Sequence, residues 1–90
     1  MKIAFLGGKR HAAARDYLEG YDKSKLDKVI EVDAPSGESA KNFQTYLLKI
    51  IKMNGEFKYF YVLNSLTVDD VKSYLDECWS LSDNIGYDFD

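Results

Sequence analysis

Three short apolar runs divide this chain, and each is followed by a segment whose apolar residues have helical spacing. The runs are Ile3–Leu6, Val29–Val32 and Phe57–Leu63, within expected strands over 2–7, 29–32 and 57–63. Strand–helix alternation repeated three times favours right-handed crossovers between parallel strands. We therefore expect an α/β fold, a minimal three-layer βαβαβα domain. Its small parallel sheet has the order 2-1-3, with helices on both faces, as in half of a doubly wound fold.

Three helices are expected between and after the strands. The first covers residues 9–20, and the second ends at Asn54-Gly55. The third begins at Thr67, which forms a start like a capping box with Asp70 in place of the usual Glu or Gln. The second and third are defined by apolar stripes: Ala40, Phe43, Leu47, Ile50 and Ile51, then Val68, Val71, Leu75 and Cys78. The third strand is apolar on both faces, which predicts a parallel strand covered from both sides.

Size and composition indicate one domain with its own core. The chain has 90 residues, 46% of them hydrophobic, which predicts a single domain over residues 1–82 and an acidic, aromatic tail over 83–90. The single cysteine, Cys78, excludes an intramolecular disulfide and a multi-cysteine zinc site. No apolar stretch approaches the ~18 residues of a membrane span, and no signal peptide precedes the first strand. We expect a cytoplasmic protein that binds no membrane. Its net charge of −3 argues against nucleic-acid binding.

The glycine pair after the first strand is the main candidate for a ligand site. Gly7 and Gly8 precede Lys9, Arg10 and His11, and a strand that turns into a helix presents free backbone N–H groups to an anion. In a parallel sheet, the other strand ends lie at the same edge. They supply Asp33, Ser36, Asn64 and Ser65. The turn matches neither G-x-G-x-x-G nor G-x-x-x-x-G-K-[ST], so a solvated basic turn is the alternative interpretation.

The Asp33 carboxylate has two interpretations as well. A dinucleotide fold keeps an acid at the end of its second strand to hold a ribose hydroxyl, while an aspartate there also starts a turn.

Catalytic and metal-binding patterns are not found in the sequence. His11 is the only histidine and no G-x-S-x-G is present, so neither a histidine pair nor a nucleophile elbow exists. Cys78 lies in a helical stripe, which predicts a buried core thiol. We expect no catalytic residue, no cofactor and no metal.

Aromatic side chains are more numerous than a small core needs, which favours an interface. The candidates are Tyr59, Tyr61, Trp79, Tyr87 and Phe89. The alternative is that the tyrosines pack with their hydroxyl groups at the surface.

The sequence therefore predicts a small non-enzymatic module, of the inhibitor or adaptor type, that contacts a partner protein. The first alternative is a domain that binds a nucleotide or phosphate ligand at the glycine turn, and the second is a small enzyme acting on a phosphorylated or nucleotide substrate. In the 2-1-3 order the third strand is an edge. The cover expected for this edge is the tail or the same strand of a second copy in a homodimer, and the third alternative is the partner protein.

Overall fold

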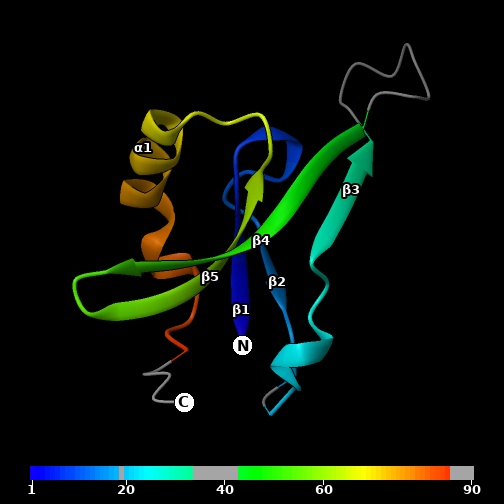
Figure 1. The fold of residues 1–90 in the computed structure, drawn as a ribbon, viewed down its shortest axis with the longest axis vertical. Helices are drawn as coiled ribbons and strands as arrows, with labels where there is room; N and C mark the ends of the chain where they lie inside the picture. Colours follow the sequence, from blue (N-terminus) through cyan, green and yellow to red (C-terminus); the bar gives the residue numbers. More distant parts are fainter. Residues whose placement is uncertain (19, 34–42, 86–90) are drawn as a thin grey trace.

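The protein is built on a curled sheet with an α-helix packed against it (Figure 1). A computed structural model describes residues 1–18, 20–33 and 43–85. In these residues the sheet has five strands in the order β2-β1-β5-β4-β3. The strands are β1 (Lys2–Leu6), β2 (Ala14–Asp16), β3 (Val29–Asp33), β4 (Phe43–Met53) and β5 (Glu56–Leu63), and the helix is α1 (Val68–Cys78). Three short 3₁₀ helices are η1 (Gly8–Arg10), η2 (Lys23–Lys25) and η3 (Trp79–Leu81).

The expected three-layer βαβαβα domain, a Rossmann-like arrangement, is wrong. Only β1 and β5 pair in parallel, and the other neighbours pair antiparallel. Helix α1 covers one face of the sheet, so the described residues form no helical layer on the other face. The 2-1-3 order is also wrong, because β3 lies beside β4 at the edge of the sheet and does not neighbour β1. Strand β4 occupies the sequence assigned to the second helix.

The helix expected over residues 9–20 is also wrong. After η1 the chain reverses at Ala12, which has a φ of 66°, and returns beside β1 as β2. Two backbone bonds fix this reversal: the Ala12 N–H donates to the Phe5 carbonyl, and the Phe5 N–H donates to Ala13. Pairing with β1 therefore overrides the helix propensity of the alanines.

The helix expected to end at Asn54-Gly55 is instead strand β4. It pairs with β5 in an eight-pair antiparallel register, from Tyr46 opposite Leu63 to Met53 opposite Glu56. Asn54 and Gly55 both have positive φ, the conformation of a two-residue hairpin turn. The apolar residues of β4 occur at helical spacing by coincidence, because both faces of this strand carry apolar side chains.

Four predicted elements are confirmed. The apolar runs form strands β1, β3 and β5, and α1 begins where the sequence predicts it. The Thr67 hydroxyl accepts the Asp70 N–H at 3.1 Å, and the Asp70 carboxylate accepts the Thr67 N–H at 3.2 Å, which completes the capping box. Strand β5 is not an edge, however, since it lies between β1 and β4.

The core consists of two clusters, one on each face of the sheet. On the outer face, α1 packs over a cluster that contains Phe60 and Cys78. The inner face carries the tyrosine-rich cluster: Ile3, Phe5, Tyr17, Leu26, Val32, Tyr46 and Tyr61. Successive side chains along a strand point to opposite faces of the sheet, so each strand contributes residues to the two faces in alternation.

The inner face is closed by the chain between β2 and β3, which we call the strap (residues 17–28, of which residue 19 is not described). Tyr17 and Tyr61 share a hydrogen bond of 2.6 Å between their hydroxyl groups, and Tyr61 also donates to the Asp27 carbonyl at 2.9 Å. An ion pair of 2.7 Å between Arg15 and Asp27 joins the strap to β2. The strap thus links the two ends of the curled sheet.

Residues 82–85, the closing segment, fill the space where β1 and β5 diverge. The Ser82 hydroxyl accepts the Ala4 N–H at 2.7 Å, and the Asp83 N–H donates to the Lys2 carbonyl. Farther on, the Ile85 N–H donates to the Phe57 carbonyl. The first residues of the predicted tail therefore pair with the sheet.

Candidate binding surface

Side chains of the protein itself form hydrogen bonds with backbone groups of the glycine turn. Strand β4 reaches it with two side chains: Gln44 accepts the Lys9 N–H at 2.6 Å, and the Tyr46 hydroxyl accepts the Arg10 N–H at 3.1 Å. The Tyr46 hydroxyl also donates to the Gly7 carbonyl at 2.6 Å. The backbone donors of Lys9 and Arg10, predicted to hold an anion, therefore already have partners.

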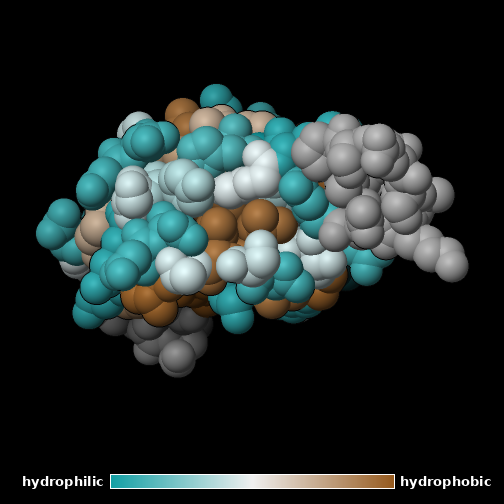
Figure 2. Space-filling model, turned by 90° about the horizontal axis from the view of Figure 1, so that it is seen from above, coloured by the Kyte–Doolittle hydropathy of each residue, from teal (hydrophilic) through white to brown (hydrophobic). Residues whose placement is uncertain are grey.

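Geometry at the turn also removes the helix on which the anion site depended. Only the three-residue η1, which begins at Gly8, stands at the turn, so no long helix directs its dipole at this point. Figure 2 looks down on this end of the molecule and shows hydrophobic residues near its middle, among hydrophilic ones. The side chains of Lys9 and Arg10 are exposed, as the solvated alternative expects.

The other predicted ligand residues are only partly brought together. Asn64 and Ser65 follow β5 and lie at the same end of the sheet as Gly7, because β1 and β5 are parallel neighbours. Asp33 ends β3 at the opposite edge, with β4 between it and β5. Ser36 lies outside the described residues.

His11, Glu77 and Cys78 form the one group of metal-type ligands in the described part of the chain. Their ligand atoms all lie within 4.8 Å of one another, with His11 Nε2 at 3.4 Å from Glu77 Oε2. The His11 ring packs on Tyr74 with centroids 4.3 Å apart. On the other side of the ring, Nδ1 accepts the Gly7 N–H at 2.9 Å.

This last bond decides the chemistry of the cluster. A ring nitrogen that accepts an N–H carries no proton, so the proton of neutral His11 is on Nε2 and points to Glu77. A metal ion at Nε2 would need the proton on Nδ1, against the Gly7 N–H. Burial raises the pKa of the Cys78 thiol, and the Glu77 carboxylate raises it further. The cluster thus holds a buried thiol beside a proton donor, an arrangement that suits neither a metal nor an activated nucleophile.

The β4–β5 hairpin extends beyond its neighbours in the sheet and forms an arm (residues 49–59). Strand β3 pairs with β4 only as far as Leu47, and β1 pairs with β5 only from Phe60 onward. Figure 1 shows the hairpin projecting past β1 beneath α1. The arm holds three lysines and one glutamate, giving it a charge of +2 in a chain whose net charge is −3.

The outer face of the arm is fixed to the end of α1. Lys58 is buried there, donates to the Trp79 carbonyl at 2.8 Å and lies 4.8 Å from the centre of the Trp79 ring. The Trp79 indole stacks on Phe60 and donates to Glu56 at 3.3 Å. These contacts make the arm a supported extension of the sheet.

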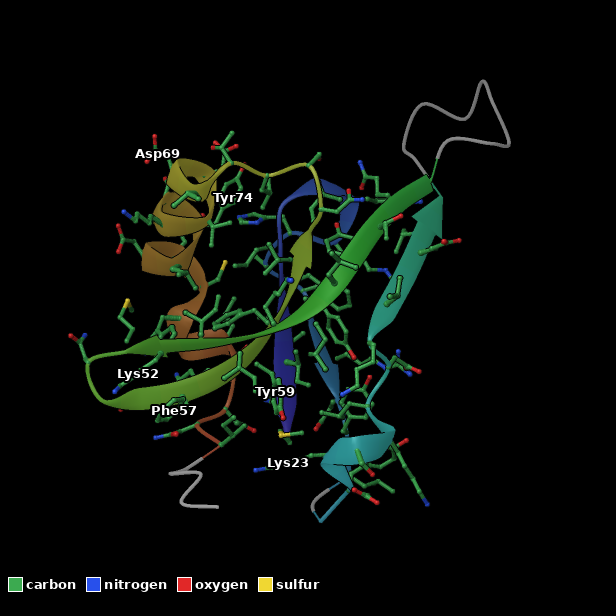
Figure 3. All side chains as sticks on the ribbon, viewed as in Figure 1. Lys23, Lys52, Phe57, Tyr59, Asp69 and Tyr74 are labelled. Atoms are coloured by element: carbon green, nitrogen blue, oxygen red, sulfur yellow. The ribbon has the colours of Figure 1, made fainter. Side chains whose placement is uncertain are left out.

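The described residues cover the inner face of the arm only in part: Tyr59 packs against the tyrosine-rich cluster, whereas Ile50 and Lys52 are exposed. We call its four side chains, Ile50, Lys52, Phe57 and Tyr59, the contact surface. Ile50 lies opposite Tyr59 and Lys52 opposite Phe57 in the register, and the Lys52 ammonium is 5.5 Å from the Phe57 ring centre. Figure 3 shows Lys52, Phe57 and Tyr59 following one another along the hairpin. Ile50 is 56% exposed, and Phe57 and Tyr59 are half-buried.

The predicted interface aromatics divide between core and surface. Tyr61 is fully buried in the inner cluster, and Trp79 packs on the arm's outer face. Tyr59 lies on the contact surface, whereas Tyr87 and Phe89 lie outside the described residues. Sequence reasoning missed Ile50, Lys52 and Phe57 because it placed the first two in a helix. The Asn54-Gly55 pair between two apolar runs is the signal that reveals this hairpin.

Comparison with protein-family models, curated proteins and solved structures finds no match for this chain. Among the described residues, no helix has the length and apolar character needed to cross a membrane.

Proposed function

We propose that this protein is a small, non-enzymatic binding module that acts by contacting a partner protein through the inner face of the arm. Ile50 is the observation that carries the proposal. Its aliphatic side chain is 56% exposed on a supported hairpin, with Phe57 and Tyr59 beside it. Protein interfaces are enriched in aromatic anchors set on such a rigid framework.

The remaining candidate sites support contact rather than turnover. At the glycine turn, the N–H groups of Lys9 and Arg10 have partners within the chain. The His11 cluster holds a thiol whose pKa is raised, whereas a cysteine nucleophile needs a lowered one. We place the module in the cytoplasm, where a lone cysteine such as Cys78 stays reduced.

Two matched substitutions test the proposal. Ile50→Asp changes the contact surface. Val68→Asp changes a more exposed aliphatic side chain, 71% against 56%, at the start of α1 and away from the arm. Both variants should fold, because surface substitutions change stability by about 0.5 kcal/mol. In affinity capture with the immobilised protein, a specific partner should be retained by wild type and Val68→Asp and lost by Ile50→Asp. Equal retention by both variants would exclude the arm as the binding surface.

A further inference from the structure

Within the described residues, the outer edge of β4 has unpaired backbone groups along the arm. The Leu48 N–H donates to the Lys28 carbonyl, so Leu48 turns its backbone groups toward β3. Alternate residues of an antiparallel strand face the same side. Ile50 and Lys52 therefore turn their N–H and C=O groups to that side as well, and no strand of the described residues lies there.

The course of the chain leaves room for a strand beside these groups. Strand β3 begins at Val29, opposite Leu47, and the residues before Lys28 belong to the strap, which turns onto the inner face where Leu26 is buried. A strand added along residues 49–53 would continue the line of β3. Its side chains would alternate between the contact surface and the outer face, where Lys49 lies.

The charges along the edge of β4 indicate which side chains the added strand should have. Lys49 is exposed on one face of this edge and Lys52 on the other, while the arm's glutamate, Glu56, accepts a bond from Trp79. Edge lysines oppose pairing with a second copy, because two arms side by side would bring four of them together. The same lysines favour carboxylates. Apolar side chains suit Ile50, Phe57 and Tyr59.

We infer that the arm binds an extended, acidic segment of a partner protein, with alternating apolar and acidic residues, by adding it as a strand to the outer edge of β4 at residues 49–53. This inference rests on the proposed function and specifies the ligand of the same surface. Backbone bonds to Ile50 and Lys52 supply affinity. The apolar side chains of the added strand lie on the contact surface, and Lys49 on the outer face selects the acidic ones.

The direct test uses blocked peptides of about eight residues, a strand's usual length. A peptide alternating valine and glutamate should bind to the whole protein, shifting the backbone amide resonances of Ile50 and Lys52. A valine–lysine peptide should bind at least about tenfold more weakly. Methylation of alternate peptide nitrogens removes the donors and should also weaken binding about tenfold, since two hydrogen bonds are lost. Equal binding of the methylated peptide would overturn strand addition.

A proline substitution distinguishes the outer edge of β4 from the hydrogen bonds between β4 and β5. Ile50→Pro removes an N–H that faces outward, so the fold should remain while peptide binding is lost. Lys49→Glu with Lys52→Glu should reverse the preference, so that the valine–lysine peptide binds more tightly. Retained binding of the valine–glutamate peptide by Ile50→Pro, or an unchanged preference in the double variant, would contradict the inference.

Other outcomes identify the failing step. If Ile50→Asp loses the captured partner but no valine–glutamate peptide binds, the proposed function stands and strand addition is wrong. If a single-stranded oligothymidylate displaces the peptide and binds more tightly, the arm is a nucleic-acid surface and the inference is wrong.

Discussion

At the residue scale, the side chain of Tyr46 determines what the backbone of the glycine turn binds. A turn that is rich in glycine and followed by basic residues indicates an anion site on local grounds. Here the Tyr46 hydroxyl occupies the turn from a strand 39 residues away in sequence, donating to the Gly7 carbonyl and accepting the Arg10 N–H. Local sequence cannot reveal a partner that the fold brings from so far.

A glycine comparison measures this contact. At Gly8, with a φ of 67°, a Cβ would lie 2.6 Å from Gln44 Oε1 and 2.7 Å from the Tyr46 hydroxyl. Gly8→Ala should therefore cost about 2–4 kcal/mol, from left-handed strain and displaced hydrogen bonds. Gly55→Ala is the control, with a φ of 79° and no atom within 4 Å, and should cost only about 1–2 kcal/mol. Equal losses in urea denaturation would mean that the turn is not held by these side chains.

Tyr61 gives the fold a sensitivity to alkaline pH. Burial raises the pKa of Tyr61, and its hydrogen bond with Tyr17 raises it further. The folded state therefore keeps this proton where the unfolded chain loses it. The contribution of Tyr61 to the free energy of unfolding is therefore fully present below pH ~10, the pKa of an unperturbed tyrosine. This contribution is lost as the pH rises above that value. In thermal unfolding followed by circular dichroism, Tyr61→Phe should be less stable near pH 7 and should show a smaller further decline above pH 10. An identical decline in both proteins would contradict the assignment.

At the scale of elements, the sequence predicts those strands and helix ends that depend on residues close together in the chain. Strands β1, β3 and β5 and the capping box of α1 follow from apolar runs and the Thr67–Asp70 spacing. Strand β4 is not predicted because its residues satisfy two periods at once. Its pairing with β5, which resolves the ambiguity, is a tertiary interaction that overrides local preference.

The same ambiguity hid the candidate surface. The aromatic content of the chain points to Tyr59 as an interface residue, but the spacing of the apolar residues predicts that Ile50 lies in a helical stripe. Only the position of Asn54-Gly55 between two apolar runs carried the information that Ile50 and Tyr59 face each other across a hairpin.

Support of the arm by α1 can be tested through Trp79. Trp79→Ala removes the ring that stacks on Phe60 and accepts the Lys58 ammonium on its face. The loss should be about 2–3 kcal/mol, and amide exchange should accelerate more in the arm than in β1. Lys52→Ala removes an exposed ammonium–ring contact on the open face and should cost at most about 0.5–1 kcal/mol. Uniform acceleration across the sheet would show that Trp79 supports the whole fold instead.

On the scale of the whole molecule, two segments outside the regular strands complete the sheet. The strap joins its two ends across the inner face, and the closing segment fills the space between β1 and β5. Neither role follows from local sequence, since each depends on where the strands lie.

Deletion of the chain end tests the closing segment. Removing residues 83–90 abolishes the bonds between Asp83 and Lys2 and the bond from Ile85 to Phe57. At about 1 kcal/mol for each hydrogen bond, the free energy of unfolding should fall by about 2–4 kcal/mol. Removing only residues 86–90 leaves these bonds in place and should therefore lower the Tm less. Equal melting temperatures for the two truncations would show that the closing segment contributes nothing.

The parallel pairing of β1 with β5 has a consequence for how the chain reaches this structure in time. On its β5 side, strand β1 pairs with Phe60–Val62, which lie more than fifty residues later in the chain. Its backbone groups on that side therefore stay unpaired until those residues are in place. Contacts so distant in sequence make folding slow, because a long loop must close before any of them forms. During synthesis, we therefore expect that side of β1 to stay unpaired until residues 60–62 have left the ribosome, a condition that favours chaperone binding to the nascent chain.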